Sequence, residues 1–275
     1  MLGPMCGRYA ASRNPDELEE IFEIDPRPDA SPVEELLPDY NVAPTKKIYA
    51  VLERPAASSG SPDTPVEAGR HDPRRQLRVV RWGLVPSWAK DPSIGSKLIN
   101  ARMETVAEKP SYRRAFARRR CLLPADGYFE WYLPTSPDAP KGRGGKPLKQ
   151  PYFIRPEGGG VLAMAGLYEI WHDKSRAEDD PAAWMWTATV LTTSAEDSVG
   201  RIHDRMPLCV EPDHWSRWLD PELTDPDEAR DLLVPAAPGH LEAIPVSTAV
   251  NNVRNNGPEL IEALPPEELV DGALF

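Results

Sequence analysis

The sequence predicts an α+β fold built around a mostly antiparallel β-sheet system. Short apolar segments with the composition of strands outnumber the helix candidates, and they do not alternate regularly with helices as in a βαβ fold. Proline-rich loops separate individual strands rather than two halves of the chain, so we expect a single domain. With 275 residues, of which 40% are hydrophobic, the chain is long enough to bury a sizeable core.

Four helices are expected. The first covers residues 14–24, because Asn14 can cap a helix and Pro15 suits its first turn. Its apolar residues recur at the spacing of one helix face: Leu18, Ile21 and Phe22. A second helix, over residues 111–120, has apolar residues on one face and arginines on the other. Residues 212–219 and 226–233 each carry proline in the first turn of a helix candidate.

The strand candidates are short runs rich in apolar, β-branched and aromatic residues. They cover residues 48–52, 77–82, 120–123, 127–131, 152–154, 161–167 and 186–191. Three segments have the composition of loops, because proline, glycine, serine and aspartate are frequent in them: 55–73, 134–151 and 179–181.

The formal net charge of −11, taken alone, argues against a polyanionic partner such as DNA. The charge is unevenly distributed, however. Residues 70–120 contain fourteen basic and four acidic residues, a net charge of +10, whereas residues 16–39 and 211–231 carry −9 and −6. The basic middle segment can therefore face a nucleic acid although the whole chain is acidic.

The three cysteines, Cys6, Cys121 and Cys209, are too few and too widely spaced for a disulfide scaffold and form no CxxC pair. We therefore expect no metal site and no cofactor, and we place Cys121 and Cys209 in the interior. No apolar run approaches the ~20 residues of a membrane span, and no signal peptide is visible. These observations favour a cytoplasmic protein without a membrane partner.

Six short segments are polar, aromatic and punctuated by glycine or proline in a way that core packing does not require. They are Met-Cys-Gly-Arg-Tyr (5–9), Tyr-Asn-Val-Ala-Pro (40–44), Trp-Gly-Leu-Val-Pro with a second tryptophan (82–88), Ile-Asn-Ala-Arg-Met-Glu (99–104), Asp-Gly-Tyr-Phe-Glu-Trp (126–131) and Ile-His-Asp-Arg-Met-Pro (202–207). In this order they resemble the SOS-response-associated peptidase (SRAP) family of abasic-site processing proteins. The resemblance extends over residues 5–260, includes a segment at 251–257, and implies a barrel-like sheet core flanked by short helices. Residues 261–275 would then form a C-terminal tail.

The resemblance implies that Cys6 is the reactive residue, exposed as the N-terminus by removal of Met5. A free α-amine titrates near neutral pH and can form a Schiff base with the aldehyde of a ring-opened abasic sugar. The neighbouring thiol then closes a thiazolidine ring. This sequence departs from the family pattern, because residues 1–4 precede Met5. Either translation starts at Met5, which we favour, or residues 1–4 form a leader that proteolysis removes.

Three further residues have catalytic roles by the same resemblance. Glu130 lies between two aromatic residues, which favours a raised pKa, and would move protons at the α-amine and during ring opening. His203 would act as a second proton shuttle, oriented by Asp204 or Arg205. Asn100 would hydrogen-bond the opened sugar or the Cys6 amine.

Candidate DNA contacts come from the motifs and from the basic segment. Arg8 and Arg102 are candidate phosphate clamps, since guanidinium groups match phosphate oxygens. Tryptophan rings can stack on bases or wedge beside an abasic gap, and core packing is their alternative role. The tryptophan candidates are Trp82, Trp88 and Trp131, with Pro44 and Thr192 as pocket contacts. The arginine run Arg113, Arg114, Arg118, Arg119 and Arg120 is expected to follow a DNA backbone without sequence specificity.

The expected function is a sensor that binds single-stranded DNA and crosslinks covalently to abasic sites during the DNA-damage (SOS) response. Weak β-elimination, a lyase activity, is a chemically natural side path from the Schiff base. Two alternatives remain at this point: a cysteine peptidase that removes its own leader, and a DNA-binding module in which the cysteine is incidental. We expect a bacterial, nucleoid-associated monomer and make no prediction about replication-fork partners.

Overall fold

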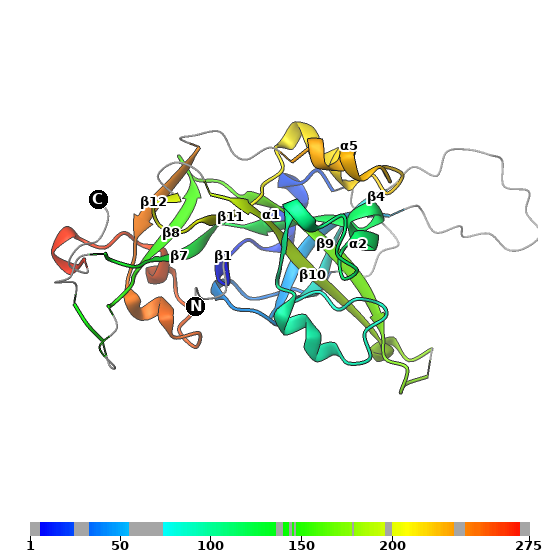
Figure 1. The fold of residues 1–275 in the computed structure, drawn as a ribbon, viewed down its shortest axis with the longest axis horizontal. Helices are drawn as coiled ribbons and strands as arrows, with labels where there is room; N and C mark the ends of the chain where they lie inside the picture. Colours follow the sequence, from blue (N-terminus) through cyan, green and yellow to red (C-terminus); the bar gives the residue numbers. More distant parts are fainter. Residues whose placement is uncertain are drawn as a thin grey trace, which may run out of the picture.

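The computed structural model describes residues 6–24, 33–54, 74–135, 140–142, 145, 147–177, 179–195, 200–233 and 240–269. Figure 1 shows two β-structures side by side, with the barrel strands β4, β9 and β10 on one side and β7, β8 and β12 on the other. The predicted loop at 55–73 lies outside the described residues.

The larger β-structure is a closed ring of strands. Its members are β3 (Lys47–Arg54), β4 (Arg74–Trp82), β6 (Arg120–Ala125), β9 (Leu162–His172) and β10 (Trp184–Ser194). They follow the order β10-β4-β3-β6-β9, and β9 pairs again with β10. Only the β4–β10 pair in this ring is parallel. The prediction of an α+β fold with a mostly antiparallel, barrel-like core is therefore confirmed.

The second sheet has the order β12-β8-β7-β1-β2. Its strands are β1 (Tyr9–Ala11), β2 (Asp39–Val42), β7 (Gly127–Tyr132), β8 (Gln150–Pro156) and β12 (Leu241–Pro245). Side chains alternate between its two faces, as the period of a strand requires. Tyr9, Tyr128 and Tyr152 join a core shared with the barrel strands, whereas Phe129 and Phe153 pack beneath the C-terminal segment.

Short helices cover the other face of the barrel strands. They are α1 (Pro15–Ile21), α2 (Arg113–Arg118), α4 (Trp215–Leu219) and α5 (Pro226–Asp231). Apolar residues from all four, including Leu18, Phe116, Trp218 and Ala229, pack into one core with the strands. Single turns of 3-10 helix connect the elements: η1 (Pro92–Lys97), η2 (Met103–Thr105), η3 (Pro181–Ala183), η4 (Pro212–His214), η5 (Thr248–Asn251), η6 (Pro258–Ile261) and η7 (Pro266–Glu268).

Two small strands complete the sheets and carry site residues. β5 (Asn100–Arg102) pairs in parallel with β10, and β11 (Arg205–Pro207) pairs with it in antiparallel. Both therefore join the same long strand and place their neighbouring residues beside it.

The predicted helix boundaries need correction. Asn14 caps α1 in a capping box with Glu17, as its sequence suggested, but the helix ends at Ile21 because Glu23 adopts a left-handed conformation (φ 53°). The second helix stops at Arg118, and residue 120 begins β6 instead. The third expected helix begins as 3-10 turn η4 before α4, and the fourth ends at Asp231.

The predicted strands are correct in place but too short. β9 extends from Leu162 to His172 and β10 from Trp184 to Ser194, because the two strands pair with each other from the Trp184–His172 pair onward. β8 begins at Gln150, inside the segment expected as a loop up to residue 151. No helix within the described residues is long and apolar enough to cross a bilayer.

Candidate active site and DNA-binding residues

The four predicted catalytic residues come from separate motifs that meet between the second sheet and β10. Cys6 lies three residues before the start of β1, Glu130 lies in β7, Asn100 begins β5, and His203 lies two residues before β11. The pairing of Tyr9 with Tyr128 between β1 and β7 brings Cys6 close to Glu130. The structure thus assembles residues separated by up to 197 positions.

Cys6 is the centre of this arrangement. Its backbone nitrogen donates a hydrogen bond to Oε1 of Glu130 at 2.7 Å, and its carbonyl oxygen accepts from Nδ2 of Asn100 at 3.5 Å. Cys6 is buried and adopts a left-handed conformation (φ 42°), which costs about 1–2 kcal/mol for a residue with a β-carbon. The fold therefore holds this residue in a specific orientation against a local preference.

The thiol of Cys6 is kept protonated by its surroundings. Burial raises its pKa well above the ordinary value, and the Glu130 carboxylate raises it further. The sulfur lies 3.9 Å from the carbonyl oxygen of Arg205, which can accept the thiol proton in a hydrogen bond. The cysteine side chain is consequently a neutral thiol at neutral pH rather than a thiolate.

Glu130 is buried on the side of β7 that faces the barrel core. Burial raises the pKa of its carboxyl, while the hydrogen bonds from Cys6 and the charge of His203 act in the opposite direction. Raising the pKa of a carboxyl brings its proton exchange closer to neutral pH. The expectation of a raised pKa at this position is confirmed, and its cause is burial.

His203 is oriented by the residue two positions later. The backbone N–H of Arg205 donates to Nδ1 of His203 at 3.1 Å, so a neutral imidazole carries its proton on Nε2. Oδ1 of Asp204 also lies 3.1 Å from Nδ1. Both orienting residues named from the sequence therefore contact His203.

The side chain of Arg205 is anchored in the protein. It is 8% exposed and pairs with both carboxylate oxygens of Glu104, the second of them at 3.0 Å. It also donates to the carbonyl oxygen of Thr192 at 2.7 Å. Because its peptide N–H binds His203 and its carbonyl accepts from the Cys6 thiol, this anchored arginine connects two of the predicted catalytic residues.

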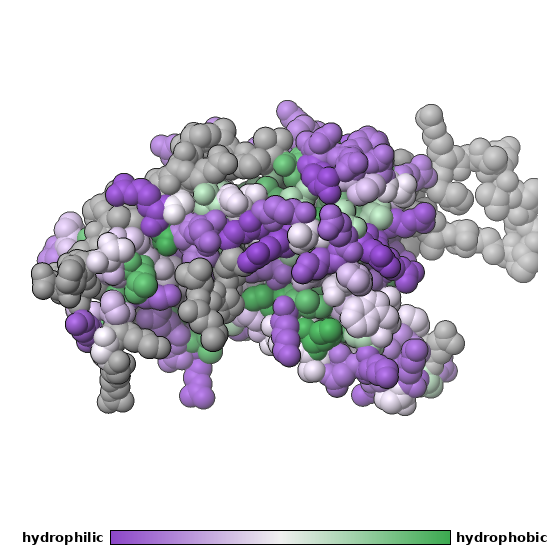
Figure 2. All heavy atoms as spheres, in the orientation of Figure 1, coloured by the Kyte–Doolittle hydropathy of each residue, from purple (hydrophilic) through white to green (hydrophobic). Residues whose placement is uncertain are grey.

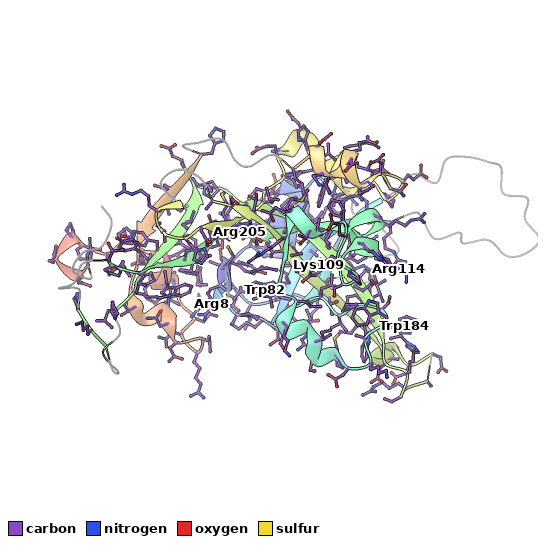
Figure 3. The ribbon with its side chains drawn as sticks, viewed as in Figure 1. Arg8, Trp82, Lys109, Arg114, Trp184 and Arg205 are labelled. Carbon is purple, nitrogen blue, oxygen red and sulfur yellow. The ribbon has the colours of Figure 1, made fainter. Side chains whose placement is uncertain are left out.

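Arg8 and Trp131 form a second cluster beside Cys6 and Glu130. The guanidinium of Arg8 lies 5.9 Å from the centre of the Trp131 ring and donates to Oδ1 of Asn41 at 2.7 Å. It also donates to the carbonyl oxygen of Val250 at 2.9 Å. Trp131 donates from its indole nitrogen to Oδ1 of Asn251 at 2.6 Å. Figure 3 shows Arg8 and Arg205 in the same part of the molecule, near Trp82.

Two of the predicted DNA contacts are corrected by their burial. Trp82 is 0% exposed, packs edge-on against Tyr9 and donates to the carbonyl oxygen of Ile99 at 3.0 Å, so it is a core residue and not a stacking surface. Thr192 is also 0% exposed, and its contacts are with Arg205 and Ala101 rather than with an open pocket.

The arginine run divides into exposed and structural members. Arg113, Arg114 and Arg118 are exposed. Arg119 pairs with the buried Glu169. Arg120 is 2% exposed and donates to five carbonyl oxygens, which belong to Phe116, Ala117, Trp218, Asp220 and Leu223. Arg120 therefore does not follow DNA, because protein carbonyls already occupy its donors, whereas the partly exposed Arg119 has one nitrogen paired with Glu169.

The remaining candidates are accessible. Trp88 is 54% exposed, Arg102 is exposed, and Pro44 is partly buried in the turn after β2. Figure 3 shows Arg114 on α2, apart from Arg8 and Arg205. Figure 2 shows that the face over α2 and β9 is largely hydrophilic. The basic segment thus presents charge to solvent at some distance along the surface from Cys6.

Asn41 and Glu104 are site-building residues that sequence reasoning did not single out. Asn41 is completely buried and binds Arg8, and Glu104 anchors Arg205. Both residues lie inside the motifs given above. The signal that could have identified Asn41 was its position between apolar residues of a strand. Among the described residues, no group of three His, Cys, Asp or Glu side chains could hold a metal ion.

The chain is similar to known proteins over most of its length. A family model described as SOS response associated peptidase (SRAP) matches residues 5–253. The chain is 38% identical over 259 residues to abasic site processing protein YoqW of Bacillus subtilis (strain 168), covering 94% of this chain and 100% of the relative. It is 32% identical over 286 residues to abasic site processing protein HMCES of Gallus gallus, covering 94% of this chain and 77% of the relative.

A solved structure shares the fold. The crystal structure of a protein from Bacteroides thetaiotaomicron matches with a TM-score of 0.69 at 22% sequence identity, covering 94% of this chain and 100% of that chain.

Proposed function

Because the chain belongs to the SOS response-associated peptidase family, we propose that it processes abasic sites in DNA by forming a covalent bond through Cys6. The observation that carries this proposal is the 2.7 Å hydrogen bond between the Cys6 backbone nitrogen and Oε1 of Glu130. Once Cys6 is the N-terminal residue, this buried carboxylate can accept a proton from the nitrogen, because a free α-amine exchanges protons whereas a peptide nitrogen does not. The reaction therefore requires Cys6 to be the N-terminal residue.

The first step is attack by the Cys6 amine on the aldehyde carbon of the ring-opened abasic sugar. The carboxylate of Glu130 takes a proton from the ammonium form, which frees the nitrogen lone pair. The amine adds to the carbonyl, and loss of one water molecule leaves a Schiff base. Asn100, which holds the Cys6 carbonyl at 3.5 Å, keeps the reacting nitrogen in place.

Ring closure follows from the neighbouring thiol. The Cys6 sulfur adds to the carbon of the Schiff base, the C=N electron pair returns to nitrogen, and the thiol proton ends on that nitrogen. Amine, thiol and aldehyde thus give a thiazolidine and one water. The imidazolium form of His203 can donate its Nε2 proton to the sugar ring oxygen during opening, which leaves a neutral imidazole. Weak β-elimination from the Schiff base is the corresponding lyase side path.

We propose single-stranded DNA as the form that is bound. An abasic nucleotide must leave a base stack to bring its aldehyde to a buried residue, which costs least when the strand is unpaired. Arg8, Arg102, Arg113 and Arg114 supply positive charge for phosphates, and Trp88 and Trp131 supply aromatic surface. None of these phosphate and stacking contacts depends on the identity of a base, which suits a lesion sensor acting in the DNA-damage response.

The experiment is crosslinking of the protein with Cys6 at its N-terminus to a single-stranded oligonucleotide that carries one abasic site. The expected product survives denaturing electrophoresis, and Cys6→Ala abolishes it. Absence of an adduct from protein with a verified Cys6 N-terminus contradicts the proposal. An adduct that persists in Cys6→Ala also contradicts it.

The peptidase alternative is favoured by one observation, the family description itself. A cysteine peptidase requires a thiolate, whereas burial and Glu130 raise the pKa of the Cys6 thiol. Intact mass distinguishes the two functions. Loss of residues 1–5 that depends on Glu130 or His203 supports self-cleavage, and loss of Met5 alone from protein expressed from that residue does not. A plain DNA-binding module would keep its function in Cys6→Ser.

A further inference from the structure

The C-terminal segment that follows β12 contains a loop with no role in the chemistry above. Its backbone carbonyls at Val250, Asn252 and Asn255 all lie within 2.9–3.3 Å of the side-chain nitrogen of Asn41. Asn41 is completely buried in β2. One side chain therefore fixes three positions of the loop from beneath.

The far end of the loop is fixed to the same strand region. The backbone N–H of Tyr40 donates to Oδ1 of Asn256 at 2.7 Å, and Nδ2 of Asn256 donates to the carbonyl oxygen of Pro38 at 3.0 Å. Asn255 donates back to the carbonyl oxygen of Ala249 at 2.8 Å. The loop is thus ordered before any ligand arrives, which lowers the entropic cost of binding.

This loop borders the proposed DNA site. Val250 accepts a hydrogen bond from Arg8, and Asn251 accepts one from the indole of Trp131, the residue next to Glu130. Figure 1 shows the segment after β12, in orange, beside the N-terminal strand β1. A strand lying across Arg8 and Trp131 would therefore meet the loop.

The tip of the loop presents an unusual pair of side chains to solvent. Val253 is 47% exposed, although a large apolar side chain normally gains by burial. Arg254 is exposed, and within the described residues its guanidinium has no hydrogen bond or ion pair. Asp39, the acidic residue at the start of β2, is already paired with Lys46 at 2.6 Å. A positive charge and an apolar group thus stand together on a rigid support.

We infer that residues 252–254 are a DNA-contact loop, in which Arg254 binds a backbone phosphate and Val253 packs against the adjacent sugar or base. A guanidinium on a fixed loop matches phosphate oxygens, and an exposed methyl-bearing side chain matches the apolar face of a nucleotide. The inference rests on the proposed function in one respect, that the polymer bound across Arg8 and Trp131 is DNA. It adds a contact outside the reacting centre.

The test measures noncovalent binding of the full chain to an undamaged, fluorescent single-stranded oligonucleotide over a series of salt concentrations. Removing one phosphate contact from a single strand lowers the slope of log K against log salt by about 0.7. We expect this change in Arg254→Ala, and we expect Arg254→Lys to retain the wild-type slope. Val253→Asn should weaken binding without changing the slope.

Lys174→Ala is the charge-matched control. Lys174 is exposed in the loop after β9, next to the segment that carries Trp184, which Figure 3 shows far from Arg8. Its slope and affinity should equal those of the wild type. An unchanged slope in Arg254→Ala, equal losses in Lys174→Ala, or a wild type that does not bind the strand would overturn the inference. Because undamaged DNA has no aldehyde, failure of the crosslinking chemistry leaves this result unaffected.

Discussion

The backbone nitrogen of Cys6 and the carboxylate of Glu130 are joined by a 2.7 Å hydrogen bond across 124 positions of sequence. The bond links the first described residue to the middle of β7, inside a core that raises the pKa of the carboxyl. In the proposed reaction this carboxylate lies next to the nitrogen that attacks the aldehyde.

Glu130→Gln tests that base. The amide keeps the shape and can accept the same hydrogen bond, but it cannot take a proton. Loss of a general base costs roughly 100-fold or more in rate. We expect a decrease of that size in the rate of adduct formation, measured by quenched time points on denaturing gels. Equal rates for the variant and the wild type would show that Glu130 is not the base.

The pH dependence of the same reaction has a defined sign. The deprotonated carboxylate is the active form, and burial raises its pKa, so the wild-type rate should rise with pH through a range above that of an ordinary glutamate. Glu130→Gln should lose this acidic limb and keep only the dependence due to the α-amine. A wild-type acidic limb centred at the ordinary glutamate value would contradict the effect of burial.

Glu130→Gln should also stabilise the protein that still carries Met5, in which the Cys6 nitrogen is an uncharged peptide nitrogen. Folding raises the pKa of this carboxyl, so its ionisation destabilises the folded protein. The destabilisation grows as pH rises from the pKa of the carboxyl in the unfolded chain to its pKa in the folded protein. Removing this buried charge should raise the free energy of unfolding at pH 7 by on the order of 1 kcal/mol. Thermal unfolding at pH 7 and at pH 4 measures this increase in the free energy of unfolding, which should be smaller at pH 4. A less stable variant at pH 7 would be the contrary result.

Glu104→Ala should disturb the site through Arg205. The substitution leaves the guanidinium with Thr192 as its main partner, although Glu104 itself is about half exposed and the pair is screened. We expect a loss of roughly 1 kcal/mol in stability and a slower adduct rate, because Arg205 holds both His203 and the Cys6 thiol. The ion pair lowers the pKa of Glu104, so its contribution should vanish as pH falls through that lowered value. Glu104→Gln is the matched variant and should retain more of the rate.

Arg120→Lys and the double variant Arg113→Ala/Arg114→Ala should behave in opposite ways. A lysine cannot reach the five carbonyl oxygens around Arg120, whose burial lowers its pKa to about 10, so stability should fall by roughly 3 kcal/mol. The affinity of the Arg120→Lys variant for single-stranded DNA should not change. The double variant should keep its stability within about 0.5 kcal/mol and lose salt-dependent affinity. Chemical denaturation and salt-titrated binding separate the two, and a reversed pattern would refute the assignment.

Local signals in the sequence predicted local structure well. Asn14 and Pro15 marked the start of α1 because a helix cap depends on residues within one turn. Seven strand centres were found for the same reason, through short apolar runs, whereas β1, β2, β5, β11 and β12 were not predicted. The strand ends were not predicted in this way, because the hydrogen bonds that extend β9 to His172 come from β10, which follows later in the sequence.

The roles of individual motif residues depended on distant partners. Trp82 and Trp88 are six residues apart and look alike in sequence, yet one is fully buried against Tyr9 and the other is 54% exposed. Arg113 and Arg120 belong to one basic run, but only Arg120 meets the carbonyls near Trp218, about a hundred positions later. Burial of this kind is a property of the assembled cores, which a single sequence does not display.

The contact between Arg8 and Val250 has a consequence for biosynthesis. The two residues are 242 positions apart, so the ribosome must make almost the whole chain before Arg8 finds that partner. At bacterial synthesis rates this interval lasts roughly 10–50 s. During that time Glu130 emerges well before Arg205 and Val250, and the N-terminus stays outside a finished fold. An enzyme that trims nascent chains would therefore meet an accessible N-terminus, and Cys6 becomes enclosed only after translation is nearly complete.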